Sequence, residues 1–145
     1  MAQGNLTADD YNYFLTQKRR VGQTRDFGLA QNQWQRNTAT NDWRRQERDL
    51  KSQFSQMRQK LPSAYAGRGL LNSGIYARDL DQFQADRTNA MGNLRGAYDD
   101  RVAGLALADR QLNQTYTYAL QDLTQAEAAR RASVAEALRA ANGDT

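Results

Sequence analysis

One stripe of large residues runs through the second half of the chain and restricts what it can fold into. Its members recur at steps of three or four, and twelve of the fourteen are apolar: Tyr76, Leu80, Phe83, Arg87, Met91, Leu94, Tyr98, Val102, Leu105, Asp109, Leu112, Tyr116, Leu120 and Leu123. The mean step is about 3.6 residues, the period of a straight α-helix and not the 3.5 of a tight coiled coil. No proline follows residue 62, so the pattern predicts one long helix over residues 74–141.

The first part of the chain predicts a shorter helical arm over residues 7–61. Thr7 is a suitable N-cap, and Asp10 completes a Thr-x-x-Asp capping box. The run 37–42, Asn-Thr-Ala-Thr-Asn-Asp, consists mostly of residues that favour caps and turns, so we expect the arm to be kinked or broken there. The single proline, Pro62, is expected to end the helix.

Residues 62–73 are expected to form the turn between the two arms. Gly67 and Gly69 can adopt a positive φ, and either Asn72 or Ser73 can cap the second helix. The predicted fold class is therefore all-α, an extended antiparallel helical hairpin that forms a single unit over residues 1–145.

The seam of this hairpin should be formed by the apolar stripes of both arms. Its predicted members are Trp43, Leu50, Phe54, Met57 and Leu61 on the first arm, and Leu80, Phe83, Met91, Leu94, Tyr98, Val102, Leu105, Leu112, Tyr116, Leu120 and Leu123 on the second. Because two helices bury only one seam, we expect several hairpins to pack side by side in an oligomer. Aromatic residues off the seam, namely Phe14, Phe27, Trp34 and Tyr118, would contact the neighbours.

Two charged residues, Arg87 and Asp109, interrupt the stripe of the second arm. Either they fix the register between helices, as polar core residues do in coiled coils, or they lie at the rim with their charge in water. The rim position is the favoured interpretation.

The composition argues against an enzyme. The chain has no cysteine and no histidine, so it lacks thiol nucleophiles, thiolate metal ligands and the commonest general base. Its three glutamates and its aspartates are scattered along both arms. We therefore expect no catalytic residues, no cofactor, no metal site and no small-molecule substrate. No apolar stretch is long enough to span a membrane.

Positive charge is concentrated in the first arm. Residues 1–60 carry 11 basic and 6 acidic side chains, whereas residues 61–145 carry 9 and 10. Two basic clusters could contact phosphates or an acidic partner: Lys18, Arg19 and Arg20, and Arg44, Arg45 and Arg48. Because acidic residues interrupt these clusters, a solvated helix face or a protein interface is the favoured interpretation.

The sequence of the turn, Ala66-Gly67-Arg68-Gly69-Leu70-Leu71-Asn72-Ser73-Gly74-Ile75-Tyr76, followed by a long helix rich in Gln, Ala and Arg, resembles small virion proteins of tailed bacteriophages. In these proteins an Arg-Gly-Leu-Leu-x-Ser-Gly element separates two long helical arms. The resemblance implies a non-enzymatic tail, head–tail or minor capsid component, synthesised in the host cytoplasm and packed with its own copies and other virion proteins. The alternatives are a DNA-associated internal virion protein released with the genome, and a cellular helical scaffold or adaptor.

Overall fold

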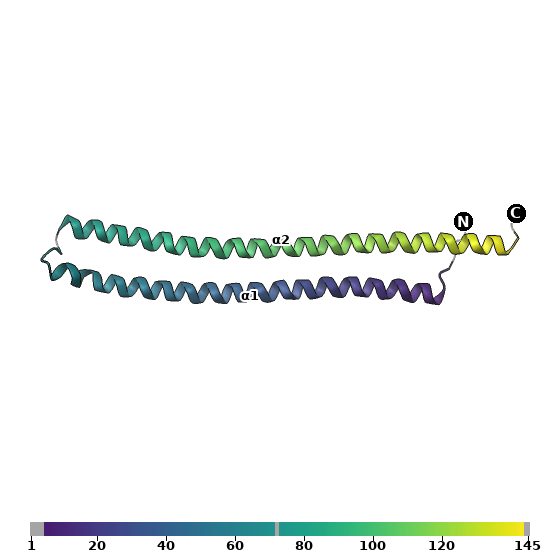
Figure 1. The fold of residues 1–145 in the computed structure, drawn as a ribbon, viewed down its shortest axis with the longest axis horizontal. Helices are drawn as coiled ribbons and strands as arrows, with labels where there is room; N and C mark the ends of the chain where they lie inside the picture. The colour runs from purple at the N-terminus through teal and green to yellow at the C-terminus, as the bar shows by residue number, and fades with distance from the viewer. Residues whose placement is uncertain (1–4, 72, 144–145) are drawn as a thin grey trace. The chain divides into compact units, whose positions relative to one another are not determined.

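The computed structural model, which describes residues 5–71 and 73–143, consists of two long helices. Helix α1 spans Ala8–Ala66 and helix α2 spans Gly74–Ala141, and the described residues contain no strand. The two helices pack against each other as an antiparallel hairpin (Figure 1). This confirms the predicted fold class. The expected oligomer stays a prediction.

The contacts within the hairpin fall into two units. The terminal unit combines Met1–Gln33 with Leu107–Thr145, and the turn unit is the continuous segment Trp34–Ala106. Each unit contains a part of both helices, so each is held together by its own stretch of seam. The prediction of one single unit over the whole chain stays a prediction.

Helix α1 begins where the capping residues predict. The backbone N–H of Asp10 donates to the Thr7 hydroxyl oxygen at 3.1 Å, and the N–H of Tyr11 donates to the Thr7 carbonyl at 2.9 Å. Thr7 therefore satisfies backbone donors that the first turn would otherwise leave without partners. Asp9 and Asp10 add negative charge at the positive end of the helix dipole.

Of the expected kink or break at residues 37–42, the break is wrong, because α1 is continuous from Ala8 to Ala66; the kink stays a prediction. Ala39 is only 3% exposed, and the Thr40 hydroxyl is hydrogen-bonded to the Tyr98 hydroxyl at 2.9 Å. The small side chain of Ala39 and the hydroxyl side chain of Thr40 are therefore accommodated in the contact with α2. Tertiary packing thus outweighs the weak helix propensity of the run.

The predicted helix end at residue 61 is also wrong, because Pro62 lies inside α1, which continues to Ala66. Tyr65, in the turn of helix after the proline, packs edge-to-face on Tyr76 of α2 with ring centroids 5.2 Å apart. Its hydroxyl also hydrogen-bonds Asp79. Pro62 has no backbone N–H, so the helix loses one hydrogen bond there. The contacts of Tyr65 with α2 stabilise the last helical turn and offset this loss.

The turn is closed by one glycine and one serine. Gly69 has a φ of 70°, which favours glycine, whereas Gly67 does not adopt a positive φ. Ser73 caps α2: its hydroxyl accepts a hydrogen bond from the backbone N–H of Tyr76 at 3.2 Å and donates to the Leu70 carbonyl at 2.7 Å. The other predicted cap, Asn72, lies outside the described residues.

Candidate interaction surfaces

Aromatic pairs form the seam of the turn unit. Trp43 of α1 stacks on Tyr98 of α2 with centroids 4.9 Å apart, and Phe54 packs edge-to-face on Phe83 at 5.5 Å. The Arg95 guanidinium lies 4.9 Å from the Trp43 ring, within cation–π distance. These contacts join α1 and α2 through residues that the sequence places on the two stripes.

The predicted seam residues are buried or half-buried, with one exception. Within the seam Leu105 is buried, and the half-buried members are Trp43, Leu50, Phe54, Leu61, Leu80, Phe83, Met91, Leu94, Tyr98, Val102, Leu112, Tyr116, Leu120 and Leu123. Met57 is exposed, which corrects its predicted place. The rings of Phe54 and Phe83 meet one turn away, so the seam at this level is already occupied.

The sequence prediction missed the part of the seam that α1 supplies in the terminal unit. Phe14, expected to face a neighbour, is buried and only 7% exposed. A Cβ placed on Gly28 would lie 2.8 Å from the Leu112 Cδ1 atom, so a larger residue at position 28 would require the Leu112 side chain to shift. Phe14, Val21 and Gly28 are spaced by seven residues, a periodic signal that is weak because one member has no side chain.

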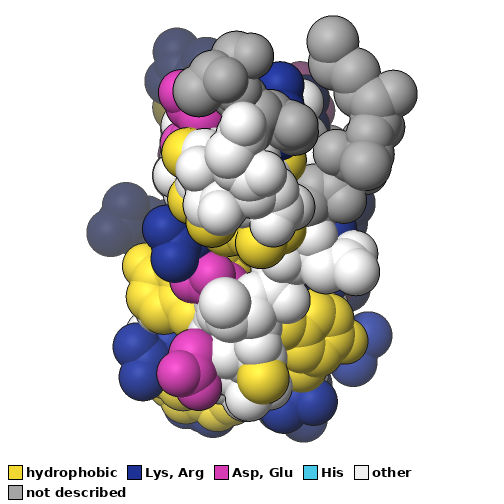
Figure 2. Space-filling view, turned by 90° about the vertical axis from the view of Figure 1, so that its right-hand side faces the viewer, with side chains coloured by type: hydrophobic (Ala, Val, Ile, Leu, Met, Phe, Trp, Pro, Cys, Tyr) yellow, Lys and Arg dark blue, Asp and Glu magenta, His cyan; other side chains and the backbone are white. Residues whose placement is uncertain are grey.

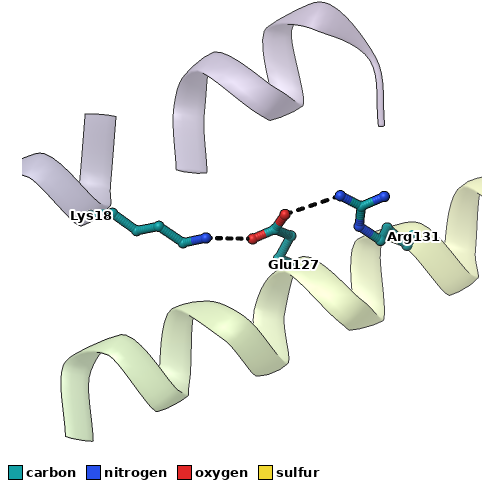
Figure 3. Close-up of polar contacts among 3 residues, drawn as sticks. All are labelled: Lys18, Glu127 and Arg131. Carbon is teal, nitrogen blue, oxygen red and sulfur yellow. Dashed lines mark hydrogen bonds and ion pairs between the residues drawn. The ribbon is translucent and has the colours of Figure 1, made fainter. Parts of the chain in front are cut away.

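Ion pairs join the helices near the chain ends. Lys18 Nζ donates to Glu127 Oε2 at 2.8 Å, and the Arg131 guanidinium donates to the other oxygen of Glu127 at 3.2 Å (Figure 3). Hydrogen bonds first from Lys18 and then from Arg131 lower the pKa of Glu127 below its usual range. Lys18 is therefore engaged within the chain, and it is not a free cation for phosphate.

A second ion pair lies at the start of α1. Arg130 Nε donates to Asp10 Oδ2 at 3.0 Å. Hydrogen bonding with Thr7 and then with Arg130 lowers the pKa of Asp10. The same carboxylate thus serves the helix cap and the contact between helices.

The two charged residues of the stripe behave differently. Arg87 is exposed, as the rim interpretation predicts. Asp109 is half-buried and accepts a hydrogen bond from Asn32 Nδ2 at 2.9 Å, which links the two helices. A polar pair at a seam favours the one register in which both groups are satisfied. The structure therefore supports the register hypothesis for Asp109 alone.

The remaining predicted basic residues are exposed: Arg19, Arg20, Arg44, Arg45 and Arg48. Within residues 5–71 and 73–143, no carboxylate lies within ion-pair distance of any of these five arginines. They contrast with Lys51, which pairs with Glu47 at 2.7 Å.

Large apolar side chains also remain at the surface. Among residues 5–71 and 73–143, ten are exposed: Tyr11, Tyr13, Phe27, Trp34, Met57, Leu71, Ile75, Leu107, Tyr118 and Leu138. Figure 2 shows hydrophobic patches between basic and acidic side chains on one face. Single exposed hydrophobic residues are ordinary, but this set is large when only three apolar residues of the described part are buried.

The described part of the chain contains no group of three or more acidic, histidine or cysteine residues that could hold a metal ion. Among the same residues, no helix is both long and apolar enough to cross a bilayer. Comparisons of the chain with protein families, with curated proteins and with solved structures found no match.

Proposed function

We propose that this chain is a non-enzymatic structural component of a tailed-phage virion, in the tail, the head–tail connection or the minor capsid. It acts through side-by-side packing of its helical hairpins with copies of itself and with other virion proteins. The phage assignment is supported by the resemblance of the turn sequence, and the packing mechanism is supported by the surface of the hairpin.

The observation that carries the packing mechanism is the imbalance between buried and exposed apolar residues. Among residues 5–71 and 73–143, three apolar residues are buried, whereas ten large ones are exposed. Exposed apolar side chains in this number are typical of a surface that contacts another protein. One hairpin therefore has apolar surface to offer a neighbour.

The turn fits the same role. Gly69 reverses the chain, Ser73 caps α2, and the Tyr65 ring joins the end of α1 to Tyr76. These are local contacts that fix how one helix leaves the other within the turn unit. They are the residues expected of an element whose task is geometric.

The test is the solution mass of the purified chain by light scattering, with far-ultraviolet circular dichroism on the same sample. We expect a highly helical species at a multiple of 16.4 kDa. A poorly helical monomer would contradict self-packing. The virion assignment is tested separately, by mass spectrometry of purified particles of the phage that encodes the chain. Its peptides should be present at a fixed ratio to the major structural proteins, and their absence would refute this assignment.

A second candidate function is that of a DNA-associated internal virion protein. The exposed cluster of Arg44, Arg45 and Arg48, which has no ion-pair partner among the described residues, favours it. Binding to duplex DNA should then weaken steeply as salt rises, and Arg44→Ala and Arg48→Ala should each reduce the salt slope by about one. Affinity that is absent at moderate salt would leave only the structural role. The remaining alternative, a cellular helical scaffold or adaptor, predicts that no phage particle contains the chain.

A further inference from the structure

One side of the terminal unit is hollowed between α1 and α2. Two adjoining hollows of about 270 and 310 Å³ lie there, and both are lined by Leu112 and Thr115. Their other lining residues include Thr24 and Gly28 of α1 and Ala108 of α2. These small side chains recur at steps of four and seven, so they lie along one side of each helix. We call this surface the groove face.

Two exposed aromatic residues stand beside the hollows. Phe27, 73% exposed, follows Thr24 by three residues, and Tyr118, 56% exposed, follows Thr115 by three residues. Residues three apart on a helix are neighbours on its surface. Each helix therefore carries one large aromatic side chain next to a small residue that lines the hollows, although neither aromatic residue lines a hollow itself.

The register of α1 and α2 in the terminal unit places each aromatic residue at about the same height as a small residue on the other helix. Arg25 lies over the Tyr116 ring at 3.8 Å, and Gly28 lies against Leu112. Counting from these contacts, Thr24 is about level with Tyr118. By the same count, Phe27 is about level with Thr115.

Besides Arg25, which is paired with Asp26, the same face carries one positive and one negative charge at the same level. Arg20 lines the hollow of about 270 Å³, four residues before Thr24, and Asp122 follows Tyr118 by four residues. Both are exposed, and within the described residues neither has an ion-pair partner. The α1 side of the face is thus positive and the α2 side is negative.

We propose that the groove face is the contact between two copies of this chain, related by a two-fold axis parallel to the helices. This operation places α1 of one copy opposite α2 of the other at the same level. Phe27 of one copy then meets Thr115 of the second copy, and Tyr118 meets Thr24. Arg20 meets Asp122 of the second copy. Because the axis is two-fold, each of these contacts occurs twice.

Size and charge both favour a second copy over another partner. Paired with itself in this orientation, the face places Phe27 and Tyr118 opposite the small residues Thr115 and Thr24, and Arg20 opposite Asp122. A helix of different sequence would need the same arrangement by coincidence. This inference rests on the self-packing part of the proposed function, and it adds the face and the symmetry.

The decisive experiment uses charge reversal and mixing. Arg20→Glu places two acid–acid contacts in the homodimer, and Asp122→Arg places two base–base contacts. Each variant alone should therefore raise the dissociation constant, measured by sedimentation equilibrium at low salt, by about tenfold or more. Mixing the two variants pairs every acid with a base across the interface, so the mixture should regain a constant within about threefold of wild type.

Two controls separate the groove face from general effects. Arg19→Glu makes the same substitution one residue away, about 100° around the helix, and should leave the dissociation constant unchanged. Phe27→Lys should weaken assembly by at least about tenfold, whereas Leu138→Lys, at an exposed residue about half a turn out of phase with Tyr118, should not. Circular dichroism of each variant checks that the hairpin is folded.

The outcomes distinguish this inference from the proposed function. If the wild-type chain is monomeric at high concentration, self-packing and the groove-face contact both fail. If the wild type is oligomeric but Arg20→Glu and Phe27→Lys behave as wild type, the copies use another face and only this inference fails. If the single variants are weakened but the mixture does not recover, the two-fold pairing is refuted.

Discussion

Replacing Leu105 with alanine measures how much stability the seam supplies. Leu105 is only 8% exposed. The substitution removes three carbon atoms, each worth about 0.8 kcal/mol when fully buried, so the transfer contribution is about 2.2 kcal/mol after allowance for the small exposed fraction. A space that does not close after the truncation would raise the loss toward about 3 kcal/mol. We therefore expect Leu105→Ala to lower the free energy of unfolding by about 2–3 kcal/mol.

Urea denaturation followed by far-ultraviolet circular dichroism gives the measurement. With a slope of about 2 kcal/mol per molar urea, the midpoint should fall by about 1 M. The matched control is Leu138→Ala in the same helix, where the side chain is 53% exposed and the loss should stay below about 1 kcal/mol. Each curve is recorded at low and at high protein concentration, because assembly would add to the apparent stability. Equal losses at both positions would refute the reasoning that burial at the seam decides stability.

Three further predictions concern the cap, the close contact and the ion pairs. Thr7→Ala should destabilise the chain by about 1 kcal/mol, while Thr16→Ala, exposed within the helix, should stay within about 0.5 kcal/mol in the same urea assay. Ala39→Leu should cost about 1–3 kcal/mol, since a residue 3% exposed has no room for extra carbons; an unchanged midpoint would contradict this close packing. The lowered pKa values of Asp10 and Glu127 mean that the unfolded chain binds more protons in acid. The stabilising contribution of these two carboxylates should be fully present at neutral pH and should be lost as the pH falls below about 5. Thermal melts across this range should show a smaller loss for Glu127→Gln, and an unchanged pH dependence would count against this ion pair.

Much of the fold could be predicted from the sequence because large apolar residues mark one face of α2. The stripe ending at Leu123 and the cap at Thr7 both depend on local spacing and side-chain chemistry, which a sequence displays directly. The prediction failed where contacts between helices outweigh local propensity. Residues 37–42 and Pro62 carry local signals for a break, but Thr40 and Tyr65 bond or pack against α2.

The part of the candidate site that could not be predicted consists of small and polar residues. Gly28 and Ala39 contribute to the seam by lacking bulk, so a search for large apolar residues passes over them. Lys18 has the sequence context of a phosphate-binding cation, but it is paired with a glutamate 109 positions away in the sequence. Such a pair becomes visible only when the register of the hairpin is known.

Asp109 offers a way to separate register from stability. Asp109→Leu would make the apolar stripe of α2 continuous there and remove the hydrogen bond from Asn32, which is half-buried and can bond water instead. The lost polar contacts of Asp109 are then partly offset by the gain in apolar burial. We expect the unfolding free energy to fall by about 1–2 kcal/mol, while the helices gain access to registers shifted by one turn.

The chain has no cysteine, so a pair introduced as Lys18→Cys and Glu127→Cys reports the register without interference. Because Lys18 and Glu127 meet at the ends of long side chains, the gap between the two cysteines is too wide for a direct disulfide, and in the otherwise wild-type chain this pair should instead be joined by a short bifunctional thiol crosslinker. In the Asp109→Leu background its yield should fall, and a pair moved by one helical turn on α2, Lys18→Cys with Arg131→Cys, should gain yield. If Asp109→Leu instead keeps the single original register and the oligomer size of the wild type, the polar pair does not set the register. The alignment would then be fixed by the shapes of the close contacts, chiefly that of Leu112 on Gly28.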